Sequence, residues 1–149
     1  MYSDQQVVDF VEKHFVPVRV HVREQKDEFQ RLGGRYSAQW TPTILIVDGD
    51  GQERYRNEGF LPKDDLLGQL TLGLGHAAFK RSDYAAAERW FRDVDEEYPR
   101  TEAAAEAQYW IGVSKYRRTN DASALKETAQ AFKERFQDSS WAKKASVWQ

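Results

Sequence analysis

The chain has 149 residues, a mass of 17.4 kDa and no cysteine. This length suits one ordinary domain or two small ones. Its 22 basic and 24 acidic residues give a net charge of −2 without a strongly basic block, so nucleic acid is not expected as a partner. The lack of cysteine excludes disulfides, thiolate metal sites and a thiol nucleophile from this polypeptide.

The sequence carries no sign of a membrane or secretory protein. No apolar run approaches the roughly 20 residues of a membrane span. The N-terminus also lacks the apolar core of a signal peptide. We therefore expect a cytoplasmic location.

The first 36 residues predict a helix, a strand and a second helix. Ser3 is a good N-cap for a helix that reaches Lys13, with valines at helical spacing. From Val16 to Val22 valines alternate with other residues, which is typical of a strand with one polar face. A second helix is expected over residues 26–36, despite the Gly33-Gly34 pair.

The segment Trp40-Thr41-Pro42-Thr43 leads directly into an apolar run. Proline removes a ladder donor, so Pro42 at this place indicates a strand entry or a cis peptide bond. The run over residues 44–47 is unbroken by polar side chains, which predicts a strand buried on both faces.

The residues that follow predict a hairpin and a third helix. Asp48-Gly49-Asp50-Gly51 supplies the turn. A return strand is expected over about residues 52–58, and its alternating charges indicate a sheet edge. A helix follows from about Lys63, where Asp64 and Asp65 suit the positive end of the helix dipole.

The Thr-Pro-Thr loop and this order of elements resemble the thioredoxin superfamily, in which the loop holds a cis-proline beside the active site. The resemblance covers roughly residues 3–72. It implies a sheet flanked by helices, in which the backbone before Pro42 pairs with an extended substrate peptide. Trp40, Thr41 and Pro42 are therefore the candidate peptide-binding residues. The alternative is a purely structural turn, with Trp40 as its cover.

The earlier part of that fold, with its central strand and Cys-x-x-Cys motif, has no counterpart in this sequence. The missing strand would lie between the strand over residues 16–22 and the strand over residues 43–47. Two unpaired inner edges would be a liability. Three explanations stay open: a truncated gene product, direct closure of the two strands on each other, or a second chain that fills the gap.

The second half becomes alanine-rich and helical from about residue 66 and contains an internal repeat. The pair Leu74-Gly75 returns as Ile111-Gly112, 37 residues later. The first copy resembles a tetratricopeptide repeat (TPR), with Gly75 at a close helix contact, Ala87 at the crossing and Phe91 as the packing aromatic. Residues 141–148 predict a capping helix.

The predicted fold class is therefore α/β plus α. Residues 1–65 form an incomplete thioredoxin-like sheet-and-helix domain. Residues 66–149 form an antiparallel helical-repeat, TPR-like domain with two repeats and the cap. Because one helical hairpin cannot bury its own apolar face, the repeats must stack on one another.

The sequence offers few candidates for chemistry. His14, His21 and His76 lack a second ligand at metal-binding spacing, so neither a metal nor another cofactor is expected. Thiol–disulfide exchange needs an attacking thiolate, which this polypeptide lacks. We expect a non-catalytic protein whose partner is a protein or an extended peptide. The alternatives are part of an oxidoreductase with upstream cysteines and a homo-oligomeric module that assembles through exposed strand edges.

Overall fold

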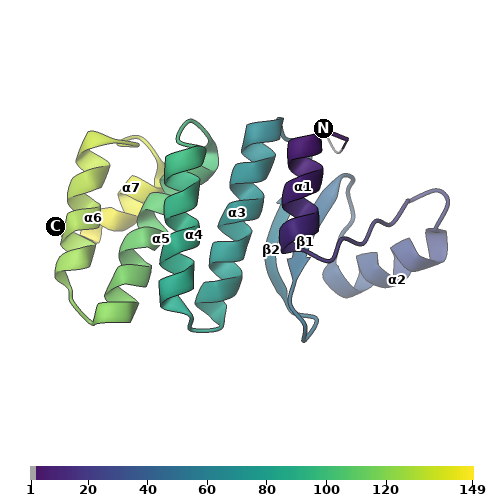
Figure 1. Cartoon of the computed structure of the whole chain (residues 1–149), viewed down its shortest axis with the longest axis horizontal. Helices are drawn as coiled ribbons and strands as arrows, with labels where there is room; N and C mark the ends of the chain where they lie inside the picture. Colours follow the sequence, from purple (N-terminus) through teal and green to yellow (C-terminus); the bar gives the residue numbers. More distant parts are fainter. Residues whose placement is uncertain (1–2) are drawn as a thin grey trace. The chain divides into compact units, whose positions relative to one another are not determined.

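The computed structural model describes residues 3–149, which separate into two compact units on either side of the bond between Lys63 and Asp64 (Figure 1). The first unit contains two helices and a two-stranded sheet, and the second is helical. In the described part of the chain, no helix is both long enough and apolar enough to cross a membrane.

The elements of the first unit lie close to their expected places. They are α1 (Gln5–His14), α2 (Lys26–Tyr36), β1 (Thr43–Val47) and β2 (Glu53–Glu58). The N-cap of α1 is Asp4 and not Ser3: its carboxylate accepts a hydrogen bond of 3.0 Å from the N–H of Gln6. The expected cap was one residue too early because both side chains suit that position.

The strand expected from Val16 to Val22 is wrong. Residues 15–21 have no regular secondary structure, and the sheet of the described residues contains β1 and β2 alone. A strand needs a neighbour to complete its hydrogen-bond ladder and to cover its side chains, and none is present. Val16 and Val18 are accordingly 93% and 79% exposed. Direct closure of this segment on β1 is therefore also wrong.

The sheet is an antiparallel hairpin with a register shift between Ile46 and Val47. Asp48 holds its turn together, since Oδ1 accepts the N–H groups of Asp50 and Gln52 at 3.0 Å and Oδ2 accepts Arg54 Nε–H at 2.6 Å. The N–H of Gln52, followed by the Arg54 guanidinium, lowers the pKa of Asp48.

The expected burial of β1 on both faces is wrong. Ile46 is buried, but Val47 is exposed and the other three residues are only half-buried. In residues 3–63, Val7 and Ile46 are the buried apolar residues. The first unit therefore encloses very little apolar surface.

The second unit is a series of antiparallel helices that carries the main core. Its elements are α3 (Lys63–Lys80), α4 (Tyr84–Glu97), α5 (Glu102–Thr119), α6 (Ser123–Glu134), α7 (Ser140–Ala145) and a 3₁₀ turn (Ser146–Trp148). Its largest fully buried side chains include Leu66, Leu67, Leu72, Phe91 and Val94. The expected cap over residues 141–148 is thus an α-helix that ends early and continues as a 3₁₀ turn.

Each of the two helical hairpins of this unit contains the same kind of close contact between its two helices. A Cβ built on Gly75 would lie 2.5 Å from the ring of Phe91, and one built on Gly112 would lie 1.8 Å from Oγ1 of Thr128. Both glycines and both partners are 37 residues apart. The internal repeat of the sequence therefore corresponds to a repeated close approach of two helices.

Candidate functional site

The loop before β1 carries the three candidate binding residues. The Thr41–Pro42 peptide bond is cis. The hydroxyl of Thr43 donates a hydrogen bond of 2.7 Å to the carbonyl of Trp40, which fixes the loop against the first residue of the strand. Trp40 is 68% exposed, Thr41 is exposed and Pro42 is half-buried. The structure thus presents Trp40 to solvent instead of using it as a cover, while the role of the three residues in peptide binding stays a prediction.

A second exposed aromatic residue lies at the same end of the sheet. The N–H of Gly59 donates to the carbonyl of Pro42 at 2.8 Å, so this pair closes the hairpin end opposite the turn. Trp40 precedes the pair by two residues, and Phe60, which is 70% exposed, follows it directly. Two large apolar side chains therefore border the loop of Pro42. The sequence analysis missed Phe60, although it is the sole aromatic in the Gly-Phe-Leu-Pro link to α3.

No strand of residues 3–149 lies beside one edge of β1, and the hairpin geometry shows which backbone groups lie there. The bonds from Gly59 N–H to Pro42 and from Asp48 N–H to Gln52 mark the residues of even number as the ones that bond to β2. Backbone groups alternate between the two edges of a strand. Thr43, Leu45 and Val47 therefore direct their N–H and C=O groups to the open edge.

Most of the exposed large hydrophobic residues belong to the first unit. Six large hydrophobic side chains are exposed in the described residues, and all but Val147 belong to the first unit: Val16, Val18, Trp40, Val47 and Phe60. The same unit encloses only two apolar side chains. Concentrated exposure of this kind is typical of an interaction surface.

Comparison with sequence families identifies the N-terminal part, since residues 1–73 match the family described as a thioredoxin-like domain. Residues 1–73 form a thioredoxin-like domain. No curated protein and no solved structure matches the chain. Because the chain has no cysteine, it holds no thioredoxin Cys-x-x-Cys active site.

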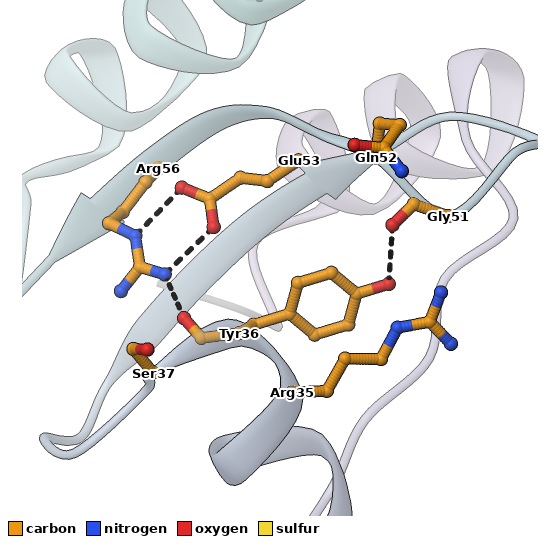
Figure 2. Close-up of a pocket in the computed structure, with 7 residues that line it drawn as sticks. All are labelled: Arg35, Tyr36, Ser37, Gly51, Gln52, Glu53 and Arg56. Atoms are coloured by element: carbon orange, nitrogen blue, oxygen red, sulfur yellow. Dashed lines mark hydrogen bonds and ion pairs between the residues drawn. The ribbon is translucent and has the colours of Figure 1, made fainter.

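The thioredoxin-like domain also contains a shallow cavity of about 430 Å³ between the end of α2 and β2 (Figure 2). Its lining comprises Arg35, Tyr36, Ser37, Gly51, Gln52, Glu53 and Arg56. The guanidinium of Arg56 forms ion pairs with Glu53 and Glu58 at 2.8 Å and donates to the carbonyl of Tyr36. The Tyr36 hydroxyl in turn donates to the carbonyl of Gly51 at 3.0 Å.

These contacts show that the residues lining the cavity stabilise the domain. The hydrogen bonds that Arg56 donates to Glu53 and then to Glu58 raise the pKa of Arg56, so its charge is permanent and most of its donors are already engaged. The cluster ties the end of α2 to the hairpin. We therefore place the candidate site at the loop of Pro42 and the open edge of β1, and not in this cavity.

Two of the three histidines are engaged in contacts within their own units. Within residues 3–149 no three His, Asp or Glu side chains are arranged to hold a metal ion. In the thioredoxin-like domain, His21 accepts the N–H of Gln25 through its carbonyl at 2.8 Å and thereby begins α2. In the helical unit, His76 pairs with Glu106 at 2.7 Å and packs against the rings of Phe91 and Trp110.

Proposed function

We propose that the protein is a non-catalytic binding protein whose thioredoxin-like domain holds an extended peptide along the open edge of β1. The single observation that carries this proposal is the unpaired row of backbone groups on Thr43, Leu45 and Val47. A bound strand would complete the ladder, as in other cases of strand addition to a sheet edge.

The surroundings of this edge indicate the chemistry of the peptide. Trp40 precedes β1 by three residues, Val47 is its last residue and Phe60 follows β2 by two residues, and all three side chains are exposed. Apolar side chains of a bound peptide can remove these surfaces from water, at about 25 cal/mol for each Å² buried. Backbone hydrogen bonds supply affinity and the side-chain contacts supply preference. We therefore expect a peptide with apolar residues at alternate positions.

We infer further that the helical unit is of the TPR type. The repeated glycine contacts at Gly75 and Gly112 support this inference, because such hairpins stack through close approach at small residues. Ala87 and its counterpart Ala124, 37 residues later, are both buried. In this proposal the unit docks a partner protein while the thioredoxin-like domain holds an extended segment, and the protein works in the cytoplasm.

Hydrogen exchange tests the proposed binding edge residue by residue. A peptide would first be selected from a displayed random library and then be added to ¹⁵N-labelled protein. We expect the amide protons of Thr43, Leu45 and Val47 to gain protection. Those of Ile44 and Ile46, which already face β2, should change much less. Failure to select a peptide, or protection confined to other residues, would show that the edge is not the binding site.

A substitution at the loop provides an independent check. Trp40→Ala should weaken binding of the selected peptide by about tenfold or more, because truncating an exposed aromatic anchor costs more than about 1 kcal/mol. Val147→Ala is the matched control, since Val147 is an exposed apolar residue of the other unit. If Trp40→Ala and the unaltered protein bind the peptide with equal affinity, Trp40 is not part of the binding site.

A further inference from the structure

The segment over residues 16–22 is irregular and ends in a turn at Val22, but in an extended conformation it would be a strand with one usable edge. Its valines share one parity, so in an extended conformation the N–H and C=O groups of Val16, Val18, Val20 and Val22 would point to the same side. Pro17 belongs to the opposite parity and has no N–H to donate. Proline is tolerated in sheets where its side of the strand faces solvent. The segment can therefore pair on the valine side only.

Both ends of this segment are held by hydrogen bonds to residues close in sequence. The N–H of Phe15 donates to the carbonyl of Val11 at 2.9 Å, which closes the end of α1. His21 exchanges hydrogen bonds of 2.8 Å with Gln25, through its N–H to the side chain and its carbonyl from the backbone N–H. Between these anchors the segment joins no ladder, and Val16 and Val18 are almost fully exposed.

Each chain thus carries an irregular segment that can pair along one side once it is extended, and one edge of β1 that has no neighbouring strand in residues 3–149. We propose that two copies exchange these elements, so that residues 16–22 of each copy pair with the open edge of β1 in the other. The occupant of the edge is then a second copy of this chain. This inference deepens the proposed function and rests on the same edge, with a client peptide displacing the resident strand.

The geometry predicts a closed dimer and not a filament. The exchange is reciprocal, so the same two elements of both copies are used and a two-fold axis relates them. After pairing, the outer side of each segment presents Pro17, which blocks addition of a further strand. The proposed pairing joins the backbone groups of the valine side of residues 16–22 to the free backbone N–H and C=O groups of Thr43, Leu45 and Val47.

Two proline substitutions test the pairing side. Val18→Pro removes an N–H on the valine side, whereas Arg19→Pro removes an N–H on the side that already carries Pro17. Both residues are exposed, and in the described residues neither N–H donates to another backbone or side-chain group, so both variants are expected to fold. Circular dichroism verifies the helical content of each.

Sedimentation equilibrium from about 1 to 300 µM, a range that detects dimers with micromolar dissociation constants, measures the outcome. We expect the unaltered protein and Arg19→Pro to be dimeric and Val18→Pro to dissociate at least tenfold more readily. A synthetic peptide of residues 15–23 should dissociate the dimer, and the same peptide with proline at position 18 should not. A monomer over the whole range, or equal behaviour of the two proline variants, would overturn the inference.

The same measurements separate this inference from the proposed function. A monomeric protein that binds a selected peptide along β1 would refute the exchange and retain peptide binding. A dimer that responds to Val18→Pro, with no peptide selected by either form, would refute peptide binding and retain the exchange. If both hold, Val18→Pro should bind the selected peptide more tightly than the unaltered protein, because no resident strand competes.

Discussion

Substitutions of Gly112 in α5 and Thr128 in α6, which contact each other, give a quantitative test of the packing. Gly112→Ala places a Cβ where the structure leaves 1.8 Å to Oγ1 and 2.8 Å to Cβ of Thr128. Carbon atoms at optimal contact are about 3.5 to 4.0 Å apart, so the helices must separate locally. Thr128 cannot turn away at no cost, because it is buried and its hydroxyl donates to the carbonyl of Ala124 at 2.8 Å.

The magnitude follows from two opposing effects. Overpacking a close contact costs about 1 to 3 kcal/mol. Replacing glycine by alanine inside a helix returns about 1 kcal/mol. Since the overlap at Gly112 involves a backbone-proximal Cβ, the upper part of the overpacking range applies. We expect Gly112→Ala to lower the free energy of unfolding by about 2 kcal/mol, which corresponds to a melting temperature lower by roughly 4 to 8 °C for a chain of this size.

A double-mutant cycle isolates the contact itself. Thr128→Gly removes the three atoms that lie nearest to the new Cβ, so Gly112→Ala should no longer be destabilising in that background. The coupling between the two substitutions is expected to be about 2 kcal/mol in favour of the double variant. Urea unfolding followed by circular dichroism and tryptophan fluorescence measures all four proteins. A stable Gly112→Ala variant, or strictly additive effects, would refute the close contact and the repeat geometry inferred from it.

Three further predictions concern charge and chemistry. Glu88 in α4 is buried and pairs with Arg92 at 2.9 Å and with Arg118 of α5 at 2.8 Å; burial alone would raise its pKa, but the two arginines outweigh burial and lower it. The ionised Glu88 therefore stabilises the fold above its ordinary pKa, and this stabilisation is lost as pH falls through the lowered pKa of the folded state. Glu88→Gln should thus lower the free energy of unfolding by about 1 to 2 kcal/mol at neutral pH and not at strongly acid pH. A loss of stability that is the same at every pH would contradict this prediction. Burial and then Glu96 raise the pKa of Asp93, so Asp93→Asn should stabilise the protein at neutral pH, with the gain vanishing on acidification in melting curves; a loss of stability at pH 7 would count against it. Finally, an insulin-reduction assay should show no activity above buffer, because no thiolate is available, and measurable turnover would refute the non-catalytic proposal.

Local patterns predicted most elements of the fold. The second helix begins and ends at the expected residues, Lys26 and Tyr36, and β1 follows the loop of Pro42 as expected. These features depend on capping, helical periodicity and the effect of proline on the ladder, all of which act over a few residues. The thioredoxin-like identity of the N-terminal part followed from the same loop and is confirmed by the family match over residues 1–73.

The failed prediction from Val16 to Val22 has a different origin. Alternation of valines satisfies the side-chain requirement of a strand, but a strand also needs a hydrogen-bonding neighbour that is distant in sequence. The sequence lacks the central strand that would be this neighbour in the thioredoxin fold, and the alternation of valines alone did not form a strand without it. The open edge of β1 likewise depends on the hairpin register. This register directs the backbone N–H and C=O groups of Ile46 toward β2 and those of Leu45 to the opposite edge. Register and close contacts such as that of Gly112 with Thr128 become visible only in three dimensions.

The scarcity of enclosed apolar residues in the first unit bears on how long the protein survives in a cell. A region with Val7 and Ile46 as its buried apolar residues opens more readily than the helical unit. Proteases act on such opened forms in proportion to their population. A ligand that binds only the folded form reduces that population by mass action. The half-life of the chain would thus follow the supply of whatever covers β1, and copies without a partner would be degraded first.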